Sequence, residues 1–168
     1  MKKPEKPKKK PVTKFEKAIS DDIPELTKVM TRAFDDDSRR FRGKPEGGGP
    51  PGYNTGEFLR KWMREGNCHK ITINGTAIGA FIVFIGEDGN NVLGTIFIDP
   101  EYQNLGIGTQ TIQFIEETYP KARRWRLGTP EWGTRNHHFY EKCGYKKIGE
   151  ERNVEEGFIG FLYEKVMK

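Results

Sequence analysis

The chain has 168 residues, of which 34% are hydrophobic and 32% are charged, and only two of them are cysteines. This length suits a single domain with one sizeable core. No stretch approaches the ~18 consecutive apolar residues of a membrane helix, and the charged start lacks the apolar run of a secretory signal, so we expect a cytoplasmic protein without membrane contact. Cys68 and Cys143 lie far apart without metal-ligand spacing, which argues against a disulfide framework or a metal site.

The excess positive charge is confined to the N-terminal arm. The first ten residues hold six lysines and one glutamate, an excess equal to the net charge of +5. Lysines alternating with prolines cannot bury a core, so we interpret residues 1–11 as a flexible, solubilising arm and residues 12–168 as one domain. Binding of nucleic acid by this arm is the alternative, but the charge-balanced body offers no basic face to continue such a surface, and a nucleic-acid partner is not expected.

The first third of the chain predicts a strand, two helices and a long loop. A short extended run covers residues 12–18. Apolar residues then recur at helical spacing, and we expect a helix that is capped by Asp22 and ends at about Phe34. Residues 35–56 combine acids, arginines and a Gly/Pro run, which predicts a loop that is either a binding lid or a tolerated insertion. Asn54 and Gly66 are expected to cap the second helix.

The rest of the chain predicts mainly antiparallel strands and two more helices. Strands at residues 68–73, 76–85 and 92–98 are joined by tight turns, the first of them Asn74-Gly75, and Gly94 suggests a bulge in the third strand. The fold class is therefore α+β with a mixed, mostly antiparallel sheet. The remaining elements are expected as a helix at 108–119, a strand at 124–127, a helix from a Thr134 cap to Gly144, and strands at 145–152 and 157–166.

A glycine-rich junction between a strand and a helix is the most informative segment. Residues 98–109 read Ile-Asp-Pro-Glu-Tyr-Gln-Asn-Leu-Gly-Ile-Gly-Thr. Helical amides at such a junction lack intrahelical partners and carry positive potential, so they suit a phosphate, and Gly106 and Gly108 leave the backbone accessible. The P-loop pattern is excluded because Gly108 is not followed by Lys, and Thr111 stands where the dinucleotide-binding fingerprint needs a small residue.

Two motifs together resemble the GNAT superfamily of N-acetyltransferases. Gln103-x-x-Gly106-x-Gly108 follows the strand Gly94-Thr95-Ile96-Phe97-Ile98, and Phe139-Tyr140-Glu141-Lys142-Cys143-Gly144-Tyr145 stands about thirty residues later. The resemblance covers roughly residues 12 to 168. It implies about seven strands, about four helices and acetyl-CoA as co-substrate, with no metal.

The resemblance also implies roles for individual residues. Tyr140 is expected to protonate the departing CoA thiolate, a role worth about 10²- to 10⁴-fold in rate. Many relatives have an asparagine seven residues before this tyrosine, where this chain has Gly133; Asn136, four residues before it, is the substitute expected to reach the pantetheine. The other residues expected to contact acetyl-CoA are Phe97, Ile98, Gln103, Asn104, Leu105, Gly106, Ile107, Gly108 and Thr109.

The sequence gives less information about the residues that bind the amine acceptor. An amine must lose a proton around the time of its attack, and the candidate bases are Asp99, Glu131, His137 and His138, of which Glu131 ranks first. We therefore expect an enzyme that moves an acetyl group from acetyl-CoA to an amine of a small molecule or peptide by direct attack. A non-catalytic sensor of CoA with the same fold is the alternative. A homodimer formed through the last strands is open, as is the identity of the amine.

Overall fold

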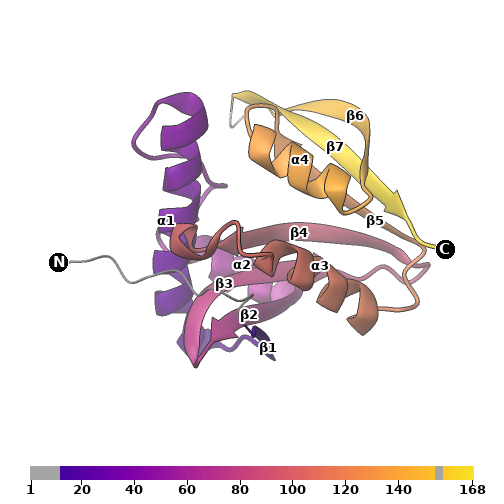
Figure 1. Ribbon diagram of the computed structural model, residues 1–168, viewed down its shortest axis with the longest axis horizontal. Helices are drawn as coiled ribbons and strands as arrows, with labels where there is room; N and C mark the ends of the chain where they lie inside the picture. The colour runs from indigo at the N-terminus through magenta and orange to yellow at the C-terminus, as the bar shows by residue number, and fades with distance from the viewer. Residues whose placement is uncertain (1–11, 154–156) are drawn as a thin grey trace.

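The computed structural model describes residues 12–153 and 157–168, so the arm expected at residues 1–11 lies outside the described residues. Seven strands form one sheet in the order β1-β2-β3-β4-β5-β7-β6. All neighbouring strands are antiparallel except β4 and β5, which run parallel. The predicted α+β class with seven strands and four helices is confirmed (Figure 1). The elements are β1 (Lys14–Lys17), α1 (Ile23–Arg42), α2 (Glu57–Glu65), β2 (Asn67–Ile73), β3 (Thr76–Phe84), β4 (Asn90–Ile98), α3 (Ile107–Thr118), β5 (Arg124–Pro130), α4 (Thr134–Lys142), β6 (Lys146–Asn153) and β7 (Phe158–Val166), with 3-10 turns at Ser20–Asp22 and Pro100–Tyr102.

Both faces of the sheet carry an apolar core, which explains why β3 is apolar at successive positions. Ala80 and Ile82 pack with α1 and α2 on one face. Phe81 and Val83 point to the other face and pack with α3, α4 and the fully buried Trp125. Successive strand residues alternate between faces, so a strand covered on both sides reads as a continuous apolar run. Figure 1 shows α3 lying in front of β3 and β4.

The hairpin between β2 and β3 turns where the sequence predicts it. Asn74 and Gly75 have φ angles of 51° and 80°, the pair of left-handed residues that a type I′ turn requires. The turn fixes the register of the two strands, so that Ile73 pairs with Thr76. This register directs alternate side chains of β3 into the two cores.

A bulge in β4 opens the sheet at its centre. Ile82 pairs with Thr95 and Val83 pairs with Leu93, which leaves Gly94 as the extra residue. A Cβ at Gly94 would lie 2.5 Å from the Phe84 ring, so only glycine fits there. The parallel pairing of β4 with β5 covers Asn90 to Val92 and does not continue past the bulge. A bulge bends its strand and increases its twist, and the two strands separate beyond it, which leaves one edge of β4 free. The bulge suggested by Gly94 is thereby confirmed.

Helix α1 is longer than its apolar pattern predicts, and residues 35–42, expected in a loop, are helical. Ion pairs along the helix surface support this extension, since Asp36 lies 3.6 Å from Arg39 and 3.7 Å from Arg40. Gly43 ends the helix with a φ of 65°. The expected loop is therefore reduced to residues 44–56.

Of the three residues predicted to cap the starts of helices, only Asp22 stands at the N-cap position, and its side chain makes no cap hydrogen bond to the helix. It accepts a hydrogen bond from the Ile19 amide behind it, at 2.8 Å, and pairs with Lys70. Gly56 occupies the cap position that was assigned to Asn54, and Thr134 is the first residue of α4 and not its cap. Helix boundaries read from a sequence shift by a residue or two because neighbouring polar residues compete for the same backbone groups.

Candidate active site

The loop before α3 presents a run of unpaired backbone amides. Asn104 and Gly106 both have left-handed φ angles, of 64° and 79°. Within the described residues, the amides from Asn104 to Thr109 donate no hydrogen bond, and the first amide of the helix that does so belongs to Gln110, which binds the Gly106 carbonyl at 3.1 Å. Successive free amides at a helix N-terminus attract an anion with several oxygens. The loop is therefore suited to a phosphate or pyrophosphate.

Gln103 adds a polar group to the same place. Its side chain is 7% exposed, and its Nε2 donates to the Ile98 carbonyl at 3.1 Å. Its Oε1 is buried without a hydrogen-bond partner among the described residues. A buried polar atom without a partner is costly, so this oxygen fits a site that is completed by a bound group carrying a donor.

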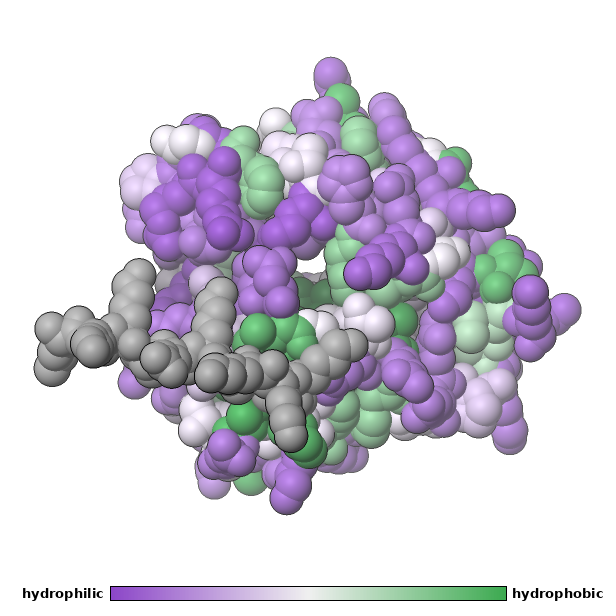
Figure 2. All heavy atoms as spheres, in the orientation of Figure 1, coloured by the Kyte–Doolittle hydropathy of each residue, from purple (hydrophilic) through white to green (hydrophobic). Residues whose placement is uncertain are grey.

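A cavity of about 370 Å³ opens beside the amide loop, between the free edge of β4 and α4. Figure 2 shows the molecule hollowed near its middle, between the parts that carry α4 and α3. All residues expected from the sequence to contact a cofactor line this cavity except Leu105, which packs against Ile71 and Ile78 instead. The lining residues that the sequence predicted are Phe97, Ile98, Gln103, Asn104, Gly106, Ile107, Gly108, Thr109, Asn136 and Tyr140.

Gly108 serves the packing of two helices as well as the site. A Cβ at this position would lie 2.9 Å from the ring of Phe139 on α4. The glycine therefore lets α4 approach the first turn of α3, which brings the predicted phosphate loop and the predicted tyrosine helix together. The sequence analysis assigned Gly108 to phosphate access alone, and this second cause depends on a contact that only the tertiary structure reveals.

Tyr140 lies where two cavities meet. Its side chain is 7% exposed and lines both the cofactor-sized cavity and a larger one of about 770 Å³. The ring packs on Tyr145 at 5.7 Å between centroids, and the hydroxyl makes no hydrogen bond to another described residue. Burial raises the pKa of Tyr140 well above its ordinary value of 10, so the phenol keeps its proton at neutral pH. A hydroxyl that keeps its proton is thus available at the junction of the two cavities.

An ion pair joins α1 to α4 beside Tyr140. Asp37 and Arg135 both line the smaller cavity and form a hydrogen-bonded salt bridge. Burial raises the pKa of Asp37, and the Arg135 guanidinium opposes that rise. Neither residue was expected at the cofactor cavity, because Asp37 was placed in a loop. The helical pattern of charges from Asp35 to Arg40 was the signal that α1 continues.

The larger cavity lies between the loop of residues 44–56 and the sheet of β5, β7 and β6. Tyr53 anchors this loop, because its hydroxyl donates to Asp35 Oδ1 at 2.5 Å and accepts from the Gly47 amide at 2.9 Å. Burial and the Asp35 carboxylate raise the pKa of Tyr53 to about 12, which keeps the donor protonated. Gly49 packs tightly under the Tyr53 ring, since a Cβ there would lie 2.4 Å from it. The loop is a fixed wall of the cavity.

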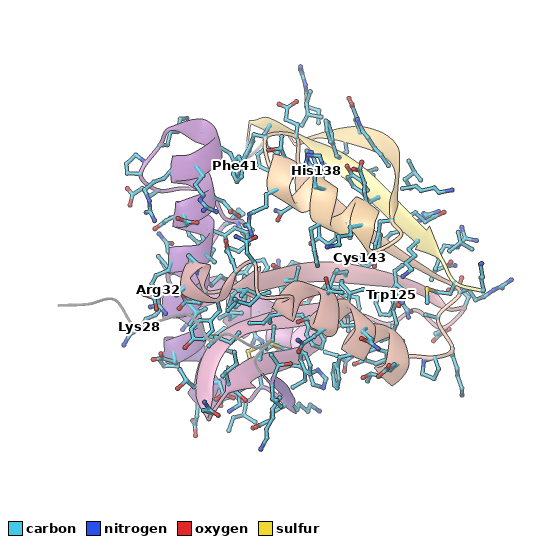
Figure 3. The ribbon with its side chains drawn as sticks, viewed as in Figure 1. Lys28, Arg32, Phe41, Trp125, His138 and Cys143 are labelled. Atoms are coloured by element: carbon cyan, nitrogen blue, oxygen red, sulfur yellow. The ribbon has the colours of Figure 1, made fainter. Side chains whose placement is uncertain are left out.

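None of the four expected bases lines either cavity. Asp99 forms a salt bridge with Arg32 of α1 at 2.7 Å (Arg32 is labelled in Figure 3). A ring nitrogen of His137 is hydrogen-bonded to the Pro130 carbonyl at 2.9 Å. His138 is exposed on α4 (Figure 3). Glu131 is also exposed, and only its backbone is tied down, by the Ile159 carbonyl at 2.8 Å. The geometry therefore gives no support to Glu131 as the base.

The carboxylate that does line the larger cavity is Glu151 on β6. It pairs with Gly160, which in turn pairs with Pro130, so all three lie on one face of the sheet. The sequence analysis missed Glu151 because its side-chain direction depends on strand register. The alternation along residues 146–153 gives two possible faces and does not say which one meets the cavity.

The arrangement thus joins an anion-binding loop, a free strand edge, a neutral phenol and a second cavity. Such a site can hold a long phosphorylated ligand along β4 and place its far end beside Tyr140 and a second molecule. Within residues 12–153 and 157–168, no cluster of His, Cys, Asp or Glu is arranged to hold a metal ion. No helix in that part of the chain is both long and apolar enough to span a membrane.

Solved structures with the same fold are acetyltransferases of low sequence identity. The PaiA N-acetyltransferase of Thermoplasma acidophilum, in complex with coenzyme A, superposes with a TM-score of 0.74 at 17% identity over 93% of this chain and 99% of that one. An acetyltransferase of Thermus thermophilus gives 0.73 at 12% identity over 92% and 97%. The ribosomal-protein-S18-alanine N-acetyltransferase of Escherichia coli gives 0.71 at 16% identity over 92% and 94%.

The sequence itself points to the same group. No curated protein matches the chain in sequence. A family profile described as the acetyltransferase (GNAT) family, however, matches residues 30–145, which include the amide loop, the free edge of β4 and Tyr140. With the fold and the site in agreement with that match, the chain belongs to the GNAT family of acetyltransferases.

Proposed function

We propose that the protein transfers the acetyl group of acetyl-CoA to a primary amine. The observation that carries this proposal is the position of Tyr140 on the wall shared by two cavities, one suited to the cofactor and one suited to an acceptor. The coenzyme A complex of the PaiA enzyme, which shares the fold, supports the choice of donor. A site for CoA alone would need no second cavity beside the phenol.

The residues of the smaller cavity would hold the donor in a defined direction. The free amides from Asn104 to Thr109 receive the pyrophosphate, and the unpaired edge of β4 offers backbone groups to the pantetheine amides. Asn136, half-buried in the first turn of α4, lines both cavities. This orientation brings the thioester to the junction beside Tyr140 and turns a bimolecular encounter into a positioned one.

The chemistry that follows is nucleophilic attack of the amine nitrogen on the thioester carbon. A C–N bond forms, the C–S bond breaks, and the electron pair of that bond leaves with the sulfur. Tyr140 gives its proton to the sulfur, which leaves as the CoA thiol, and the proton that the nitrogen loses as the amide forms restores the Tyr140 phenol. Burial keeps the phenol protonated until the thiolate develops. The Glu151 carboxylate attracts the protonated amine into the larger cavity, where the amine releases one proton to solvent before it attacks.

The test combines binding with turnover. Acetyl-CoA binding is measured by calorimetry, and release of the CoA thiol is followed across a panel of amines. We expect saturable binding of acetyl-CoA and amine-dependent release of CoA. Binding without release for any amine would favour the sensor, and absence of binding would contradict the assignment of the amide loop.

A further inference from the structure

Two glycines in the larger cavity are not explained by the fold. Gly128 on β5 and Gly160 on β7 both line this cavity, and neither has a left-handed φ. A Cβ at Gly128 would meet nothing closer than Leu162 at 3.8 Å, and one at Gly160 nothing closer than the Glu151 carbonyl at 3.6 Å. These are ordinary contacts. Glycine inside a strand lowers stability unless the backbone or a close neighbour requires it, so a different cause is needed.

Other strand glycines of this chain do have such a cause. A Cβ at Gly79 would lie 2.2 Å from the Phe97 carbonyl, and one at Gly94 would lie 2.5 Å from the Phe84 ring. Close packing therefore excludes any larger residue at these two positions. Gly128 and Gly160 are distinguished by open space above them, which belongs to the cavity.

The two glycines share one face of the sheet. Gly128 pairs with Leu162, and Gly160 pairs with Pro130, so the four positions lie side by side on the same surface. The opposite surface is covered by α4, whose His137 stacks on Phe161 at 4.9 Å. We call Gly128 and Gly160 the glycine floor. The cavity above it exists because the sheet presents bare backbone there.

The walls around the glycine floor are rich in aromatic rings. Phe34, Tyr53, Trp132 and Phe158 line the cavity, and Tyr140 lies at its junction with the cofactor cavity. Tyr140 is a buried residue that lines both cavities. A volume of about 770 Å³ lies within the range of pockets that enclose drug-sized ligands. The space thus suits an acceptor with a sizeable apolar body and one polar end.

The charged residues that line the cavity have both signs, since Glu151, Arg42 and Arg152 all line it. Register places the Glu151 side chain on the same face as the glycine floor, whereas Arg152, the next residue, belongs to the other face of the strand. The Arg42 guanidinium is already engaged, because it lies 5.1 Å from the Trp132 ring and donates to the Gly47 carbonyl at 2.9 Å. The glycine floor is therefore flanked by a carboxylate, which attracts the ammonium group of an amine.

We propose that the acceptor is an arylalkylamine, a primary amine joined by a short chain to an aromatic ring. This inference rests on the proposed acetyl transfer. The flat ring lies on the glycine floor among aromatic side chains, where ring pairs add to simple burial. The amine reaches past the floor to Tyr140 and the thioester.

The first experiment compares matched amines on the wild-type enzyme. The kcat/KM values for CoA release are measured with 2-phenylethylamine, its saturated analogue 2-cyclohexylethylamine and propylamine. Binding of the same amines to the enzyme with CoA is measured by calorimetry. We expect 2-phenylethylamine to exceed both 2-cyclohexylethylamine and propylamine by about tenfold in both measurements, because one or two favourable contacts between aromatic rings give a preference of that size.

The second experiment fills the glycine floor. Gly160→Val and Gly128→Val place a branched side chain where the ring would lie, and both positions have the space and the φ angle for it. Each is expected to lower kcat/KM for 2-phenylethylamine by about 30-fold while the Kd of acetyl-CoA stays within about twofold. The control is Gly149→Val, because Gly149 pairs with Leu162, has no neighbour closer than 3.9 Å and does not line the cavity. Should a valine variant fail to fold, the alanine variant at the same position gives a smaller loss in the same direction.

The outcomes separate this inference from the proposed function. If acetyl-CoA binds and propylamine or 2-cyclohexylethylamine reacts as well as 2-phenylethylamine, the enzyme is an acetyltransferase and the arylalkylamine assignment is overturned. Equal losses in the Gly160→Val and Gly149→Val enzymes would overturn it as well. If acetyl-CoA does not bind, the proposed function itself fails. Where no amine reacts, calorimetry decides, since failure of 2-phenylethylamine to bind the CoA complex contradicts the glycine floor directly.

Discussion

Replacing Tyr140 by phenylalanine removes one oxygen atom from the junction of the two cavities. The hydroxyl makes no hydrogen bond to another described residue, so its loss leaves no protein group without a partner. The ring contacts with Phe139 and Tyr145, at 5.2 and 5.7 Å, do not involve the oxygen. We therefore expect the free energy of unfolding to change by less than about 1 kcal/mol. The variant therefore tests the loss of the hydroxyl proton without a large change in the packing of the ring.

The catalytic effect should be much larger. A positioned acid contributes about 10²- to 10⁴-fold, which corresponds to about 2.7 to 5.4 kcal/mol at the transition state. The Tyr140→Phe enzyme is expected to lose that factor in kcat while its Kd for acetyl-CoA changes by no more than about threefold. Single-turnover release of the CoA thiol is the assay, because it reports chemistry without product release.

Tyr145 provides the matched control. It is also a buried tyrosine whose pKa is raised by burial, and its ring contacts that of Tyr140, but it lines neither cavity. Tyr145→Phe should leave single-turnover rates within about twofold. If the two variants lost activity equally, or if Tyr140→Phe retained more than a fifth of the wild-type rate, the role of Tyr140 as proton donor would be refuted.

Three further changes test other parts of the site. Gly106→Ala places a Cβ on a residue with a left-handed φ, which costs about 1 to 2 kcal/mol of stability, and it should weaken CoA binding about tenfold. The control is Gly43→Ala, which introduces the same backbone strain away from the cavities and should leave CoA binding unchanged. If calorimetry gave equal Kd values for the two variants, the role of the amide loop in CoA binding would be contradicted. Because the pKa of Tyr140 lies above 10, the proton donor persists as pH rises, and kcat should show no loss of activity from this group up to pH 10; a fall with a lower midpoint that disappears in Tyr140→Phe would be evidence against it. The raised pKa of Asp37 means that its stabilising contribution is full below its unfolded value of 3.8 and is lost as pH rises through its higher folded value. Urea unfolding should therefore show that Asp37→Asn gains stability relative to wild type as the pH is raised above about 4, and a difference that shrinks with rising pH would contradict this sign.

The sequence determined the parts of this protein whose causes are local. The Asn74-Gly75 turn has the φ angles that its residue types favour, and the β-branched runs on either side form the two strands of a hairpin. The amide loop is equally local, because Gly106 and the helix that starts at Ile107 leave the same backbone groups free in any surrounding. The residues that these features predicted to contact the cofactor all line one cavity, except Leu105.

The tertiary structure decided everything that depends on which segments meet. The end of α1 could not be read from its apolar face, because Asp37 is paired with Arg135, a residue nearly a hundred positions away. The direction of Glu151 follows from its pairing with Gly160, and strand register is set by the whole sheet. Glu131 lies in the turn that follows β5, where it is exposed and lines neither cavity. Local chemistry therefore specified the loop that we propose to bind an anion, and long-range pairing specified which side chains line the larger cavity.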